Sequence, residues 1–214
     1  MFDLTDQNVC LLIIDMQNEF LSPNGYFALK QGWPVESFQG CITQCQKLHR
    51  AAQKSGYRVI YTATGYSPDG SDSYVACHTI LPTIFIEPDG RPRTTDAAVV
   101  KGSWGAQIIP ELAPTGEDYV IHKRRFNAFY QTELEHMLRC WKVDTLLVCG
   151  MITEVCVEST IRGAFVPGFD VLEVRDGVGS WNQQRHEASL QAVDFSFGRV
   201  IDTQTALELL AARR

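Results

Sequence analysis

Residues 145–160 read TLLVCGMITEVCVEST, and this stretch decides the fold predicted for the chain. Its first four residues, 145–148, are apolar or β-branched and predict a strand buried on both faces. Gly150 permits a tight turn after that strand. Thr153 is a suitable N-cap for a following helix, and Glu154 suits the positive end of the helix dipole. The stretch therefore predicts a strand, a turn and the start of a helix.

Cys156 falls at about the third position of that helix, where the Thr153 hydroxyl can reach its backbone N–H. Because a helix N-terminus favours negative charge, we expect the pKa of the Cys156 thiol to be lowered. Such a thiol is a candidate nucleophile. A buried structural cysteine fits this stretch equally well, so both interpretations stay open at this point.

Short apolar segments alternate with helical segments along the rest of the chain. We predict strands at 9–14, 57–62, 118–122, 170–174 and 199–201, and helices at 35–55, 132–141, 184–192 and 203–212. The alternation is typical of parallel βαβ units and predicts an α/β fold with a doubly wound sheet. The region 63–116 is long and irregular, and 106–112 is a candidate short helix within it. With no linker in 214 residues, we expect a single domain, 1–214.

Composition excludes several classes of partner. The net charge is −6 and no long basic block occurs, which argues against nucleic acid or an anionic membrane. The first residues lack the basic and apolar parts of a signal peptide, and no apolar run reaches the roughly 20 residues needed to span a bilayer. The seven cysteines are odd in number and form no CxxC pair. We expect a cytoplasmic protein with free thiols and no nucleic-acid or membrane partner.

Three reactive residues follow predicted strands or turns: Asp15, Lys123 and Cys156. Ligands of open parallel sheets bind at the carboxyl ends of the strands. Singly, Asp15 fits a turn and Lys123 a solvated strand end, but their shared placement favours a site. Asp15 would act as general base, Lys123 would orient Asp15, and Cys156 would attack an acyl or carbamoyl carbon. Backbone N–H groups around Ile152 and Cys156 would stabilise the oxyanion.

Aromatic residues near these positions are candidates to wall a small pocket, although aromatic residues are more often core. The candidates are Phe20, Tyr66, Trp104, Phe126 and Phe129. We assign Phe20, Tyr66 and Phe126 to substrate binding.

Four segments together resemble the isochorismatase-like cysteine hydrolases, and the match spans nearly the whole chain. They are LIIDMQN at 12–18, KGSWGA at 101–106 with PEL at 110–112, KRRFNAF at 123–129, and GMITEVCVEST at 150–160. The resemblance implies a six-stranded parallel sheet in a Rossmann-like three-layer fold with helices on both faces. It implies an Asp15, Lys123, Cys156 triad and a non-proline cis peptide bond between Met151 and Ile152, which would turn the Ile152 N–H into the oxyanion hole. It also implies a homo-oligomer, a dimer or a tetramer.

Departures from the family pattern bear on the chemistry. Nicotinamidase-like members carry an Asp-x-His…His metal set after the second strand, whereas this chain has no histidine there until His78. We therefore predict no metal and no cofactor. Members that hydrolyse isochorismate often lack the cysteine, so Cys156 favours cleavage of a C–N bond. The CVEST run is similar to that of ureidoacrylate amidohydrolases, but Thr64 stands where those have Asn, and Asn127 where many members have Ser.

The sequence thus predicts a metal-free cysteine amidohydrolase that acts on a small amide or ureido compound through a thioester-type intermediate. Its substrate stays open. One alternative is isochorismatase-type vinyl-ether hydrolysis that uses Asp15, with Cys156 incidental. Another is a catalytically idle binding module. A dinucleotide-dependent oxidoreductase is disfavoured, because no GxGxxG follows a strand.

Overall fold

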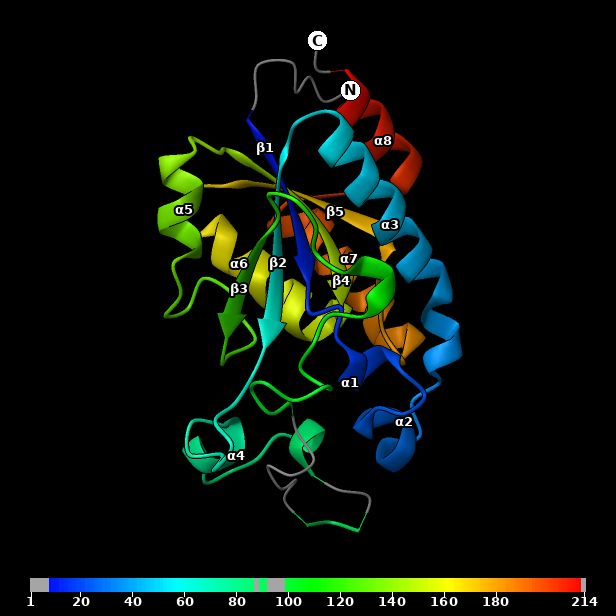
Figure 1. The fold of residues 1–214 in the computed structure, drawn as a ribbon, viewed down its shortest axis with the longest axis vertical. Coiled ribbons are helices and arrows are strands. Elements are labelled where there is room, and N and C mark those ends of the chain that lie inside the picture. The colour runs from blue at the N-terminus through cyan, green and yellow to red at the C-terminus, as the bar shows by residue number, and fades with distance from the viewer. Residues whose placement is uncertain (1–7, 87–88, 92–98, 213–214) are drawn as a thin grey trace.

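A sheet of six parallel strands forms the centre of the protein (Figure 1). The computed structural model describes residues 8–86, 89–91 and 99–212. The strand order is β3-β2-β1-β4-β5-β6, so the direction of winding reverses between β1 and β4. The strands are β1 (Val9–Ile14), β2 (Arg58–Thr64), β3 (Tyr119–Lys123), β4 (Thr145–Met151), β5 (Asp170–Gly179) and β6 (Arg199–Ile201). The predicted fold class is confirmed, and the reversal places a crevice at the carboxyl ends of β1 and β4.

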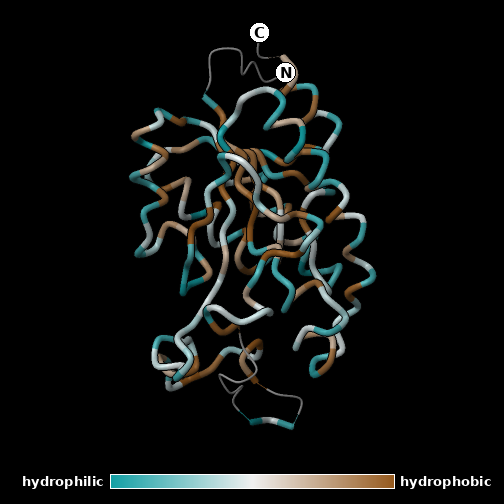
Figure 2. The backbone as a smooth tube through the Cα atoms, in the orientation of Figure 1, coloured by the Kyte–Doolittle hydropathy of each residue, from teal (hydrophilic) through white to brown (hydrophobic). Residues whose placement is uncertain are grey.

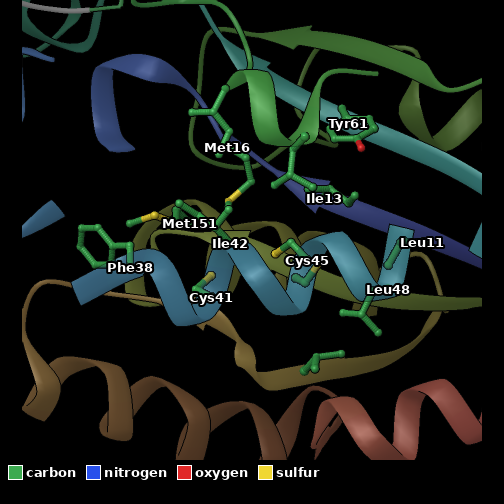
Figure 3. Packing of buried hydrophobic residues seen from close by; sticks show 14 of the residues in the cluster. Leu11, Ile13, Met16, Phe38, Cys41, Ile42, Cys45, Leu48, Tyr61 and Met151 are labelled. Atoms are coloured by element: carbon green, nitrogen blue, oxygen red, sulfur yellow. The ribbon is translucent and has the colours of Figure 1, made fainter. Parts of the chain in front are cut away.

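Helices cover both faces of the sheet. One face packs against α3 (Gln39–Lys54) and α8 (Thr203–Ala211), and the other against α5 (Leu134–Cys140), α6 (Glu158–Phe165) and α7 (Gln183–Ser196). Side chains alternate along β1, because Leu11 and Ile13 join the α3 cluster while Leu12 and Ile14 join the cluster beneath α5 and α6. Figure 3 shows Ile42, Cys45 and Leu48 of α3 packed over this sheet. The central strands are accordingly hydrophobic along their length (Figure 2).

The segment between β1 and residue 32 contains two short helices, α1 (Asn18–Leu21) and α2 (Tyr26–Gln31). The helix predicted from residue 35 begins as a 3₁₀ turn, Val35–Phe38, before α3. The irregular region holds α4 (Tyr74–Cys77) and a 3₁₀ turn at Thr83–Phe85; residues 87–88 and 92–98 of it lie outside the described residues. The helix predicted at 106–112 is wrong.

Only a 3₁₀ turn, Pro110–Leu112, forms in that last segment. Pro110 has no backbone N–H, so it cannot donate the helical hydrogen bond to the carbonyl four residues before it. The residues that precede it pair instead with the loop after β1. The backbone N–H of Ile109 donates to the Met16 carbonyl, and that of Asn18 to the Gln107 carbonyl. The segment therefore braces the carboxyl end of β1.

Gly150 allows β1 and β4 to approach closely at the crevice. Its φ is +120°, and a Cβ built there would lie 2.2 Å from the Ile14 carbonyl oxygen. A side chain at this position would push apart the two central strands, so the glycine fixes the distance between the end of β1 and the turn after β4.

Glu173, in the middle of β5, is a buried carboxyl group. Its side chain is fully enclosed, and neither oxygen has a hydrogen-bond partner within the described part of the chain. Burial, and secondarily the nearby charge of Glu158, raise its pKa to about 8. Glu173 is therefore protonated in the folded protein at neutral pH.

This carboxyl group should make stability fall as pH rises. Below about pH 4.5 the Glu173 carboxyl group is protonated in both the folded and the unfolded state. Between about pH 4.5 and about pH 8 it ionises in the unfolded chain but stays protonated in the folded protein. Glu173→Gln should remove this slope, so that the variant gains a few kcal/mol of unfolding free energy relative to wild type across the window. Urea denaturation at a series of pH values measures it, with exposed Glu111→Gln as control. If unfolding free energy plotted against pH gave parallel curves for wild type and Glu173→Gln, Glu173 would not be the source of the slope.

Candidate active site

Asp15 follows β1 directly and is held by two threonines of the neighbouring strand. Its carboxylate accepts hydrogen bonds from Thr62 Oγ1 at 2.6 Å and Thr64 Oγ1 at 2.9 Å, and its backbone N–H donates to the Thr62 carbonyl at 3.1 Å. Its φ of +48° lies in the left-handed region, which aspartate tolerates better than most residues. The end of β1 thus aims a fixed carboxylate away from the strand.

Lys123, the last residue of β3, forms a buried ion pair with Asp15. Its Nζ lies 2.6 Å from Asp15 Oδ2 and donates to Thr64 Oγ1 at 2.8 Å and to the Arg125 carbonyl at 3.1 Å. The side chains are 0% and 1% exposed. Burial alone would lower the pKa of Lys123, but Asp15 and the nearby Cys156 outweigh it and raise the pKa, so the amine is charged.

Cys156 completes the group from the turn after β4. Its Sγ lies 3.4 Å from Lys123 Nζ, and the thiol is buried. The Met151–Ile152 peptide bond is cis, as the family resemblance implies. The structure therefore brings together the three predicted residues Asp15, Lys123 and Cys156 from β1, β3 and the turn after β4.

The turn that carries Cys156 differs from the prediction. Residues Thr153–Val157 form one π-helical turn before α6, and Thr153 is not an N-cap. Its hydroxyl instead lies 2.9 Å from Nδ1 of His186 on α7. The reason is tertiary: Thr153 is buried against α7, where a side-chain partner is available to its hydroxyl.

The expected lowering of the thiol pKa is also wrong. Burial raises the pKa of Cys156 well above its usual value; Lys123 lowers the pKa, but by less than burial raises it, and the Asp15 carboxylate raises it again. The loss of water around the buried thiol outweighs the effect expected at a helix end, and the adjacent carboxylate adds to it. Cys156 therefore rests as a protonated thiol beside a carboxylate and an ammonium group.

A pocket opens onto Cys156 and Asp15 at the carboxyl ends of the strands, where α2 and α4 lie beyond the strand tips (Figure 1). The predicted residues Phe20, Tyr66 and Phe126 line it, and so does Ile152. Their part in binding stays a prediction. Two other candidates do not line it: Trp104 is 47% exposed, and Phe129 packs against Phe169 in the core, with ring centroids 5.7 Å apart.

Several residues of the site were missed in the sequence. Gln17 is fully buried and binds the backbone of Thr64 twice, through Nε2 to the carbonyl and through Oε1 from the N–H, both at 2.8 Å. A polar residue soon after a strand that ends in Asp15 was the available signal. The pocket also contains four unforeseen aromatic side chains, those of Phe27, Trp33, Tyr74 and Phe85.

In the described part of the chain no three His, Cys, Asp or Glu side chains are grouped as metal ligands. The absence of a metal and of a cofactor stays a prediction, as do the homo-oligomer and the cytoplasmic location. Between residues 8 and 212, wherever the chain is described, no helix has the length and apolar character to cross a membrane.

The doubly wound sheet and the Asp15, Lys123, Cys156 group define an α/β protein with a buried thiol beside a carboxylate and an ammonium group. An isochorismatase-domain family model matches residues 9–205. Ureidoacrylate amidohydrolase RutB of Acinetobacter baylyi is 32% identical over 210 residues, which cover 94% of this chain and 83% of that protein. The chain belongs to the isochorismatase family of hydrolases. The predicted family and the prediction of an enzyme of that family are confirmed.

Solved structures agree in fold. A cysteine hydrolase from Pseudomonas syringae pv. phaseolicola superposes with a TM-score of 0.80 at 24% identity and covers 96% of this chain and 93% of its own. An isochorismatase family protein from Desulfovibrio vulgaris superposes with a TM-score of 0.77 at 28% identity, over 96% of this chain and 99% of its own. The fold is thus common to this chain and to other members of the family.

Removing the amine of the buried pair should destabilise the fold strongly. Lys123→Met leaves the Asp15 carboxylate buried without its counter-charge and should cost about 3–5 kcal/mol of unfolding free energy. The double variant Asp15→Asn/Lys123→Met should recover more than half of this loss. Guanidinium denaturation measures both, with exposed Lys47→Met as control. A single variant as stable as wild type would contradict this account of the pair.

Proposed function

We propose that this protein is a cysteine-dependent amidohydrolase that cleaves a C–N bond in a small amide or ureido compound through a covalent thioester-type intermediate. The observation that carries the proposal is the mutual contact of Asp15, Lys123 and Cys156 at the base of the pocket. Lys123 Nζ lies 2.6 Å from Asp15 Oδ2 and 3.4 Å from Cys156 Sγ. The relatives named ureidoacrylate amidohydrolase support cleavage of a C–N bond.

The first half of the reaction forms the intermediate. Because the pKa of the Cys156 thiol is raised, the thiol needs a base, and the Asp15 carboxylate takes its proton as Sγ attacks the carbonyl carbon. The backbone N–H groups of Ile152 and Cys156, which line the same pocket, stabilise the oxyanion. Asp15 then gives the proton to the leaving nitrogen, and ammonia or an amine departs.

The second half releases the acid. Asp15, again a carboxylate, takes a proton from a water molecule, and the resulting hydroxide attacks the thioester carbon. The tetrahedral species collapses, the C–S bond breaks, and the thiol regains its proton. Throughout, the Lys123 ammonium stays charged and keeps Asp15 in place, because its pKa is raised.

Removal of the sulfur is the direct test of this proposal. Cys156→Ala should lower ammonia release from a panel of small amides and ureido compounds by at least about 1,000-fold, since no covalent intermediate can form. Cys140→Ala removes an exposed thiol and should keep wild-type activity. A spectrophotometric ammonia assay measures both, and denaturation curves check folding. Full activity of Cys156→Ala would exclude the covalent route, and pyruvate release from isochorismate would favour vinyl-ether hydrolysis.

Removal of the base should slow the same step without removing the nucleophile. Asp15→Asn keeps the size of the side chain and should reduce kcat/KM by about 100- to 10,000-fold, the usual contribution of a positioned general base. The residual rate should rise with pH, because ionisation of the thiol then depends on solvent hydroxide. A flat pH profile with near wild-type kcat/KM would contradict the role given to Asp15.

A further inference from the structure

Two groups of aromatic rings face the pocket from different parts of the chain. The first wall comprises Phe20, Phe27 and Trp33, with centroids 5.1 Å apart between Phe20 and Phe27 and 4.1 Å between Phe27 and Trp33. The second wall comprises Tyr74, Phe85 and Phe126, in which Tyr74 and Phe126 are 4.5 Å apart and Phe85 and Phe126 are parallel within 3°. Both walls offer apolar surface to whatever lies above Cys156.

The charge of the pocket is negative or zero. Among the described residues that line it, Asp15 is the only one with a formal charge. Lys123 lies behind Asp15, and its three N–H donors are shared among four partners of the protein: Asp15, Thr64, the Arg125 carbonyl and Cys156 Sγ. Lys123 therefore has no donor left with which to bind a substrate carboxylate.

The nearby guanidinium of Arg125 is also engaged by the protein. Its Nη1 donates to the Asp72 carbonyl at 2.7 Å and to the Arg124 carbonyl at 2.8 Å, and its Nη2 donates to Cys77 Sγ at 3.3 Å. Its Cζ lies 5.0 Å from the centre of the Tyr74 ring. Arg125 thus supports the second wall through two backbone carbonyls, the Cys77 sulfur and the Tyr74 ring.

Building on the proposed function, we propose that the substrate is a small uncharged amide with a short apolar acyl group, and that the pocket rejects amides bearing a carboxylate. The cavity above Cys156 measures about 50 Å³, which suits a small substrate. A carboxylate there would lose its water, find no cation among the described residues that line the pocket, and lie near Asp15. Hydrolysis of the amide by water yields ammonium and a carboxylate. The apolar walls disfavour this charged carboxylate product, so it leaves the pocket readily.

The test compares two amides of the same shape. Isovaleramide carries an uncharged isopropyl group at the position where malonamate carries a carboxylate. With wild-type protein, kcat/KM for ammonia release should be at least about 100-fold higher for isovaleramide, because an unpaired buried charge is expensive. Equal or higher kcat/KM for malonamate would overturn the proposal.

A cation placed in the pocket should reverse part of this preference. Val75 lines the pocket on α4, whereas its neighbour Ala76 is exposed and does not line it. Val75→Arg should improve the ratio of malonamate to isovaleramide at least about tenfold, and Ala76→Arg should leave the ratio unchanged. An equal change in both variants, or none in Val75→Arg, would contradict a charge-based selection within the pocket.

Alkylation separates this inference from the proposed function, because it needs no turnover. Iodoacetamide and iodoacetate differ in charge, and mass spectrometry gives their rates at each cysteine. The iodoacetamide-to-iodoacetate ratio at Cys156 should exceed that at exposed Cys140 at least about tenfold. If no amide is hydrolysed but this excess holds, the proposed function fails and the selectivity stands. An equal or smaller ratio at Cys156 overturns the selectivity, whatever the amide assays give.

Discussion

The contact between Lys123 and Asp15 is the constraint on which the rest of the site depends. Two opposite charges sealed from water are tolerated only when every remaining donor and acceptor is satisfied. Thr62 and Thr64 on β2 supply those partners, and they do so only because β2 is registered between β1 and β3, with Thr64 opposite Lys123. Strand register and site geometry are thus a single requirement, and a slip of one residue would break both.

The Cys156 thiol is added to this pair from the other side of the winding reversal. Gly150 brings β4 against the end of β1, and the turn that follows delivers the thiol to the ammonium group. Outside the sheet, α7 holds that turn through His186 and through Ser189, whose hydroxyl donates to the Thr153 carbonyl at 3.4 Å. The sulfur is therefore positioned by the sheet below and by a helix behind, while burial, Lys123 and Asp15 together set the pKa of the thiol.

How far the sequence predicts this protein depends on the range of the interactions involved. Apolar strands ending in Asp15 and Lys123 are local patterns, so the sheet and the meeting of the three residues were predictable. The thiol pKa was not, because burial of Cys156 arises only when the chain folds. The second aromatic wall was not either, since Tyr74 and Phe85 lie in an irregular region without periodicity and meet Phe126 only in three dimensions. Nor was the protonated state of Glu173 predictable, because no local sequence pattern shows that its carboxyl group is buried in the core.

Arg125 links the second aromatic wall, through its guanidinium group, to the Asp15–Lys123 pair, through its backbone carbonyl. Its carbonyl accepts from the Lys123 ammonium, while its guanidinium grips the Asp72 carbonyl and lies over Tyr74. A ligand that displaced the second wall would therefore move the residue whose carbonyl accepts a hydrogen bond from the Lys123 ammonium group. Occupancy of the pocket and the position of the Asp15–Lys123 pair are consequently coupled through one residue, so a molecule that fits the pocket poorly would also disturb that pair.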